Sequence, residues 1–195
     1  MVAMRRRRVM LVMMFTVVLS LTASPALAHL QHNVDDACAS PDSTYFSRFG
    51  PEQFWHWITG NGYNNGCFIW TTTTAGTSSV NYAEWYLPSQ PEICSGYVHD
   101  FYVDTWIDGD YHFGTTSALY RRWRYGHGGG ITETYKVSQA ALADVFKRVT
   151  SVNGPPTYDH FDACKGGLMS LGDLTKETTQ HYIGWDYMKY IPKPH

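Results

Sequence analysis

The sequence predicts an all-β protein: a jelly-roll-like antiparallel β-sandwich with a short N-terminal extension and at most one or two short helices. Aromatic and β-branched residues gather in short runs, which is typical of strands. Gly, Pro, Asn and Asp separate these runs at roughly even spacing, as turns do in a sandwich. The abundance of Tyr, Trp, Thr and Gly also favours strands and turns over helices.

The clearest strand signal is the run from Asn81 to Pro88. Alternation places Tyr82, Glu84 and Tyr86 on one face and Ala83, Trp85 and Leu87 on the other. Pro88 has no backbone donor and ends the hydrogen-bond ladder. We therefore expect neighbouring strands on this segment and a buried position for Trp85.

Seven strand-like runs follow the turn at residues 61–66. They cover residues 67–74, 81–88, 101–107, 118–125, 132–139, 167–172 and 181–191. The glycine-rich connection at 126–130 predicts a hairpin between the fourth and fifth runs. Residues 140–150 have near-helical spacing of apolar residues and predict a short surface helix, and residues 51–58 are compatible with one or two helical turns.

Residues 1–28 have the order of a secretory signal peptide. Four arginines, Arg5 to Arg8, precede an apolar stretch from Val9 to Leu21, and Ala26-Leu27-Ala28 follows as a cleavage site. The apolar stretch is shorter than the about 20 residues that a membrane anchor needs. We expect cleavage after Ala28, a secreted protein, an extension at 29–60 packed on the domain, and a domain at 61–195.

Removal of the signal peptide leaves 11 Lys+Arg against 17 Asp+Glu, a net charge of −6. Nucleic-acid binding requires a basic surface, so the balance argues against it. The only basic cluster left is Arg121, Arg122 and Arg124, which alternates with aromatic residues in an expected strand.

Four cysteines in an exported chain predict two disulfides, and none of them is spaced as a zinc site requires. If successive strands alternate in direction, Cys67 and Cys94 lie at one end of the sandwich. Cys164 then lies at the other end, about 20 Å away, whereas a disulfide joins Cα atoms less than about 7 Å apart. The predicted pairs are Cys67–Cys94 and Cys38–Cys164.

Several of these segments together resemble the golvesin-like domain, which also occurs at the C-terminus of xanthan lyases. The matching segments are Asn81 to Pro88, Phe101 to Ile107, Thr115 to Tyr120, Val137 to Gln139, Leu171 to Glu177 and Ile183 to Tyr190. The resemblance covers about residues 61–191 in the family's order. It implies a β-sandwich of the carbohydrate-binding kind, without catalytic residues to carry over. The chain departs from the pattern at Cys94 and at the insertion 140–165.

Aromatic faces beside polar groups are what sugar recognition requires, because the C–H faces of sugars stack on rings and their hydroxyls form hydrogen bonds. The candidate ligand-binding residues are Trp106, Tyr111, Trp123 and Tyr125, which flank two loops. The alternative is that these rings fill the core, as we expect for Trp70 and Trp85. A calcium site at Asp108 and Asp110 is a weaker hypothesis, since two carboxylates are too few.

The sequence thus predicts a secreted, non-catalytic module that binds a polysaccharide or cell-wall glycan and needs no cofactor. A secreted structural or adhesive protein without a glycan ligand is the alternative. A copper-dependent polysaccharide oxidase is a further hypothesis, with His29 at the new N-terminus and His99, His112 or His127 as the second ligand. A hydrolase would need paired carboxylates, and Glu84, Asp104 and Asp186 follow no such motif.

Overall fold

The structure is a computed structural model that describes residues 31–35, 45–89, 98–109, 113–124, 131–140, 144–149, 159–162 and 166–192. Within these residues the chain forms thirteen strands and two short 3-10 turns, η1 (Glu52–Phe54) and η2 (Tyr63–Asn65). Every pairing between these strands is antiparallel. The predicted all-β antiparallel sandwich is confirmed. No helix in this part of the chain is long and apolar enough to cross a membrane.

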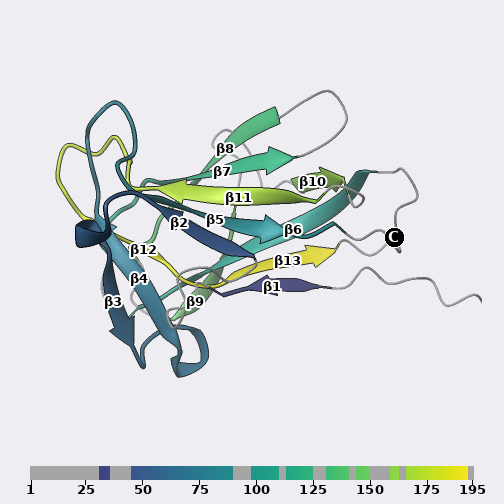
Figure 1. Cartoon of the computed structure of the whole chain (residues 1–195), viewed down its shortest axis with the longest axis horizontal. Helices are drawn as coiled ribbons and strands as arrows, with labels where there is room; N and C mark the ends of the chain where they lie inside the picture. Colours follow the sequence, from purple (N-terminus) through teal and green to yellow (C-terminus); the bar gives the residue numbers. More distant parts are fainter. Residues whose placement is uncertain are drawn as a thin grey trace, which may run out of the picture.

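The first five-stranded sheet, called here the β11 sheet, has the order β2-β5-β11-β7-β8 (Figure 1). Its strands are β2 (Phe46–Phe49), β5 (Tyr82–Leu87), β11 (Gly167–Gly172), β7 (Ala118–Arg124) and β8 (Ile131–Val137). The predicted hairpin between the fourth and fifth runs is confirmed as β7 and β8. The predicted faces of β5 are also confirmed, since Ala83, Trp85 and Leu87 are buried. The centre of the sheet is β11, however, and β5 lies beside it.

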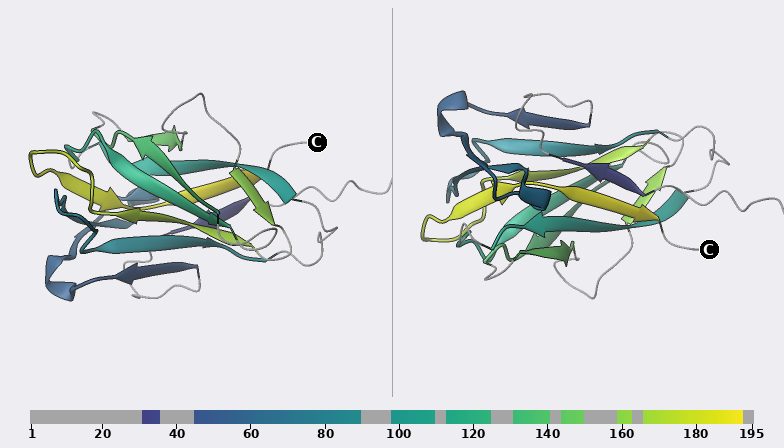
Figure 2. Two further views of the ribbon diagram at one scale, coloured as in Figure 1. Left: turned by 90° about the horizontal axis from the view of Figure 1, so that it is seen from above. Right: turned by 90° about the horizontal axis from the view of Figure 1, so that it is seen from below.

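The second five-stranded sheet, the β6 sheet, is built on the longest strand, β6 (Val98–Ile107). β13 (Met188–Pro192) pairs with one edge of β6 and carries β1 (His32–Val34) on its far side. β9 (Val145–Arg148) and β10 (Asp159–Asp162) pair with β6 at its two ends. In Figure 2 the strands of the β11 and β6 sheets run roughly along the long axis of the molecule.

The β4 sheet has three strands, in the order β12-β4-β3, and lies at the left end of the molecule in Figure 1. Its strands are β12 (Tyr182–Trp185), β4 (Cys67–Thr72) and β3 (His56–Thr59). A small second core of Phe68, Ile107 and Phe113 packs here, with Ile58 and Trp70 partly buried against it.

Inward side chains of all three sheets form one main core. Its largest members are Trp85 and Trp185, whose ring N–H groups donate to the backbone carbonyls of Asp186 and Leu171, both at 2.9 Å. Tyr190 donates its hydroxyl to the carbonyl of Trp85 at 2.6 Å. These bonds let large polar aromatics be buried without leaving a donor unsatisfied.

The structure differs from the sequence predictions at two segments. The helix predicted within 140–150 is wrong, because Val145–Arg148 is strand β9 paired with β6. The run 181–191 is two strands, since the chain leaves the β4 sheet after Trp185 and enters the β6 sheet at Met188. In addition, the segment at 29–60 supplies a strand to each sheet, β1, β2 and β3.

Candidate functional site: a groove across the β11 sheet

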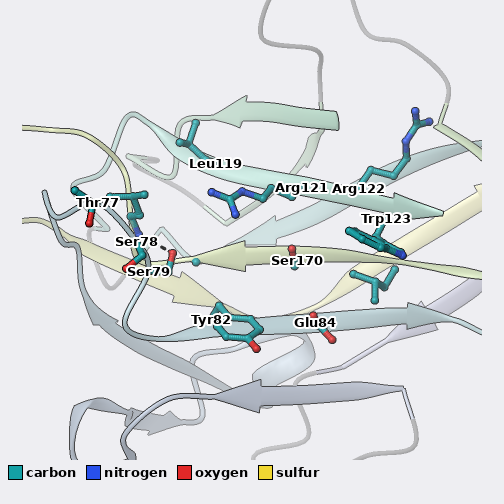
Figure 3. A pocket seen from close by; sticks show the side chains of 13 residues that line it. Thr77, Ser78, Ser79, Tyr82, Glu84, Leu119, Arg121, Arg122, Trp123 and Ser170 are labelled. Atoms are coloured by element: carbon teal, nitrogen blue, oxygen red, sulfur yellow. Dashed lines mark hydrogen bonds between the residues drawn. The ribbon is translucent and has the colours of Figure 1, made fainter. Parts of the chain in front are cut away.

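A groove of about 760 Å³ lies on the outer face of the β11 sheet (Figure 3). Its floor is the central strand β11, whose outward residues are Leu168, Ser170 and Gly172, and the last two of these are small. The neighbouring strands carry larger outward side chains. The groove exists because these small residues of the central strand lie between larger outward side chains of β5 and β7, which form its two walls.

The β5 wall is formed by Tyr82 and Glu84, and the β7 wall by outward residues Leu119, Arg121 and Trp123. Alternation along each strand explains this, because the residues between them face the core. Glu84 and Arg121 both pair with Ser170, on opposite sides of β11. A carboxylate and a guanidinium therefore flank the middle of the groove.

Two exposed rings lie toward opposite ends of the groove. Trp123 is 43% exposed and Tyr82 is 37% exposed. Tyr82 pairs with Gly172 and Trp123 pairs with Leu168, so the two positions are offset by about 14 Å along the strands and about 10 Å across them. Figure 3 shows the rings on the two sides of β11. Their spacing suits an extended ligand rather than a compact one.

The loop before β5 closes the end of the groove near Tyr82 with Thr77, Ser78 and Ser79. Asp173 fixes this loop, because its two carboxylate oxygens accept the backbone N–H groups of Val80 and Asn81 at 2.9 and 3.0 Å. Burial raises the pKa of Asp173 above its ordinary value, and the hydrogen bonds to its carboxylate oppose this shift. The loop brings three hydroxyl groups to the groove.

The two neighbouring arginines of β7 have different roles. Arg122 points inward, is buried, and forms an ion pair with Glu133 at 2.7 Å. Arg121 is exposed in the groove. On the opposite wall, Glu84 accepts a hydrogen bond from the hydroxyl of Tyr86. The groove therefore offers a charged donor, a charged acceptor, hydroxyls and two rings.

Of the predicted ligand-binding residues, Trp123 lies in the groove and Trp106 does not. Trp106 is on the outer face of the β6 sheet, on the other side of the core, half-buried against Phe146 and Tyr63 with ring centroids 4.9 and 5.2 Å away. Lys189 covers the same cluster, with its Nζ 3.5 Å from the centre of the Phe146 ring. The structure does not bring Trp106 and Trp123 into one site.

Other predicted residues lie outside the described residues. These are Tyr111, Tyr125, Asp110, His29, His112 and His127, and the side chain of His99 is likewise not described. Cys67 is disulfide-bonded. Cys38, Cys94 and Cys164 lie outside the described residues, so the pairs Cys67–Cys94 and Cys38–Cys164 stay predictions.

The acidic residues weighed for metal binding or hydrolysis do not form a common site. Glu84 lies in the groove, Asp104 is on the outer face of the β6 sheet with Arg148, and Asp186 is buried between β12 and β13. Asp108 is also buried rather than solvated. The described part of the chain contains no group of three or more His, Cys, Asp or Glu side chains placed to hold a metal ion.

Sequence reasoning missed most of the groove. The signal that the sequence does contain is the alternation of β5, which places Tyr82, Glu84 and Tyr86 on one face. The floor residues Ser170 and Gly172 carry no signal of their own, because small residues in a strand do not indicate a ligand. Only the strand order brings them between β5 and β7.

No protein-family model matches the chain, and no curated protein matches it either. The chain is similar to the solved structure of an exo-β-1,3-galactanase from Phanerochaete chrysosporium with galactose, with a TM-score of 0.45 and 7% identity over 83% of this chain and 29% of that one. It is similar to the cleaved adhesin domain of Lys-gingipain from Porphyromonas gingivalis, with a TM-score of 0.40 and 10% identity over 85% of this chain and 100% of that one.

A third similar structure contains modules of endo-1,4-β-D-xylanase 10B from Clostridium thermocellum complexed with xylohexaose. Its TM-score is 0.37 with 12% identity, over 77% of this chain and 26% of that one. The chain therefore spans less than a third of the length of the first and third of these proteins. TM-scores this low establish nothing about what the chain binds. The resemblance to golvesin-like domains stays a prediction.

Proposed function

We propose that this protein is a non-catalytic module that binds an extended glycan chain in the groove of the β11 sheet. The observation that carries the proposal is the pair of exposed rings, Trp123 and Tyr82, at the two ends of a groove lined between them by hydroxyl, carboxylate and guanidinium groups. Secretion, expected from residues 1–28, would place the groove where extracellular polysaccharide is present.

The chemistry of the groove suits a sugar chain. Sugars present C–H faces that stack on aromatic rings, and hydroxyls that need both donors and acceptors. Trp123 and Tyr82 supply the rings, Glu84 supplies an acceptor, and Ser170 supplies a group that both donates and accepts.

The test is binding of the mature protein to a panel of soluble and insoluble polysaccharides, measured by affinity electrophoresis and isothermal titration calorimetry. Trp123→Ala should weaken binding by about 1–3 kcal/mol, the scale of a lost aromatic platform and its buried area. The side chain points outward, so the circular dichroism spectrum and the urea midpoint should stay unchanged.

Tyr182→Ala is the matched control, because Tyr182 is equally exposed, at 45%, but lies on β12 in the β4 sheet. It should leave glycan affinity unchanged. Equal losses from both substitutions would show that the groove is not the site. No binding to any polysaccharide would reject the proposal and favour a structural or adhesive role.

A further inference from the structure

We propose that the groove takes an anionic polysaccharide, and that Arg121 and Lys136 bind its carboxylate or sulfate groups along the β7 and β8 side. This inference rests on the proposed glycan-binding function and adds the class of ligand. It follows from where charged side chains lie on the outer face of the β11 sheet.

Arg121 and Lys136 form a pair of cations on this face. Arg121 pairs across the strands with Thr134, and Lys136 pairs with Leu119, so the two cations are diagonal neighbours on β7 and β8. Diagonal positions on one face of a sheet lie about 7–8 Å apart, within reach of long side chains. Both residues are exposed. Arg121 therefore lines the groove on its β7 side, and Lys136 lies one strand further out, on β8.

Arg121 also differs from the other arginines whose side chains the structure describes. Arg48 pairs with Glu52 at 2.8 Å, Arg122 pairs with Glu133 at 2.7 Å, and Arg148 pairs with Asp104. Among the arginines whose side chains the structure describes, Arg121 alone has no acidic partner. A guanidinium presents a planar fork of donors that matches a carboxylate or sulfate with two parallel hydrogen bonds.

The opposite wall has the opposite charge. Glu84 lies across Ser170 from Arg121, two strand spacings or about 10 Å away. The groove is thus polarised, with an acceptor on β5 and cations on β7 and β8. An anionic chain fits with its charged groups toward Arg121 and its hydroxyls toward Glu84, whereas a neutral chain leaves Arg121 with hydroxyl partners only.

The protein as a whole is acidic. The chain carries a net charge of −2, and −6 without residues 1–28, so it has no general attraction for polyanions. Binding to an acidic polysaccharide must therefore come from a local cationic site and overcome the repulsion of the remaining surface.

The experiment compares polysaccharides that differ in charge. Polygalacturonate and its fully methyl-esterified form test carboxylate, and dextran sulfate and dextran test sulfate, with cellulose and xylan as further neutral ligands. Wild type should bind one acidic member at least tenfold more tightly than its neutral counterpart. Arg121→Gln should weaken binding to that acidic member about tenfold or more, and Lys136→Gln should weaken it less.

Lys176→Gln is the matched control, because it removes one exposed positive charge from a residue that does not line the groove. It should leave the affinity unchanged, and urea denaturation should show that all three variants are folded. Added NaCl should weaken the binding of wild type more than that of Arg121→Gln, since the charge pair is screened.

The outcomes separate the two proposals. Equal binding to acidic and neutral members, lost in Trp123→Ala and unchanged in Arg121→Gln, would overturn the anionic ligand and keep the glycan groove. Equal losses in Arg121→Gln and Lys176→Gln would also overturn it, because the effect would then be one of overall charge. No binding to any of these polysaccharides would overturn both proposals.

Discussion

Asp186 should make the protein less stable as the pH rises toward 8, and Asp186→Asn should remove this dependence. Asp186 is 5% exposed; its Oδ2 accepts the backbone N–H of Tyr63 at 3.0 Å, and its Oδ1 has no hydrogen-bond partner. Burial raises its pKa from 3.8 to about 8, with smaller contributions from the charges of Asp35, Asp108 and Asp144. The folded protein thus holds a proton on this carboxyl at neutral pH.

The direction of the effect follows from proton binding. Between about pH 4 and pH 8 the folded state keeps the proton of Asp186 while the unfolded state has lost it. The free energy of unfolding therefore falls as the pH rises through this window, by at most about 1.4 kcal/mol per pH unit. Above pH 8 both states are ionised, and the contribution levels off.

Asp186→Asn keeps an oxygen to accept the N–H of Tyr63 and has no proton to lose. Urea denaturation is followed by tryptophan fluorescence. Between pH 5 and pH 8 the free energy of unfolding of the variant should rise by about 2–4 kcal/mol relative to that of wild type, and above pH 8 the difference should level off. Other titrating groups are shared by both proteins and cancel in the difference. Parallel stability curves across this range would refute the argument that burial keeps Asp186 protonated.

Two glycines should be intolerant of a methyl group, for steric reasons. A Cβ on Gly172 would lie 2.0 Å from the Oγ of Ser79, so Gly172→Ala should displace the loop at the end of the groove, lower glycan affinity and raise the exposure of Ser79. Adding Ser79→Gly should restore part of the affinity, because it relieves the clash but removes one hydroxyl group from the groove, and a double variant as weak as Gly172→Ala alone would contradict this cause. A Cβ on Gly184 would lie 2.2 to 2.6 Å from three atoms of the Phe113 ring. Gly184→Ala should therefore lower the free energy of unfolding, measured by urea denaturation, by about 1–3 kcal/mol. An unchanged urea midpoint would mean that the second core is loosely packed.

Local patterns in the sequence predicted the strands well. The alternation in β5 identified its buried face. In β6 the same alternation buries Phe101, Val103 and Ile107 and leaves Trp106 on the outer face. Both patterns depend only on the two-residue period of a strand next to a core.

Contacts between distant segments could not be predicted in this way. The near-helical spacing around Val145 and Phe146 was overridden because the segment pairs with β6 and Phe146 packs on Trp106. The interruption after Trp185 has a similar origin, since Asp186 turns the chain from one sheet into another and bonds to Tyr63, far away in sequence. Pairing energy from other strands decides such cases, and local propensity does not.

The groove also depends on contacts between distant segments, and for this reason only part of the site was predicted. Its three strands come from residues 82–87, 118–124 and 167–172, and its shape depends on small residues in the last of these lying between large ones in the other two. Each strand alone looks like an ordinary half-buried strand. Trp123 was identified because a large ring beside a loop suggests a sugar platform even without its neighbours. The role of Arg121 could not be predicted, because its place opposite Glu84 exists only once β11 separates them.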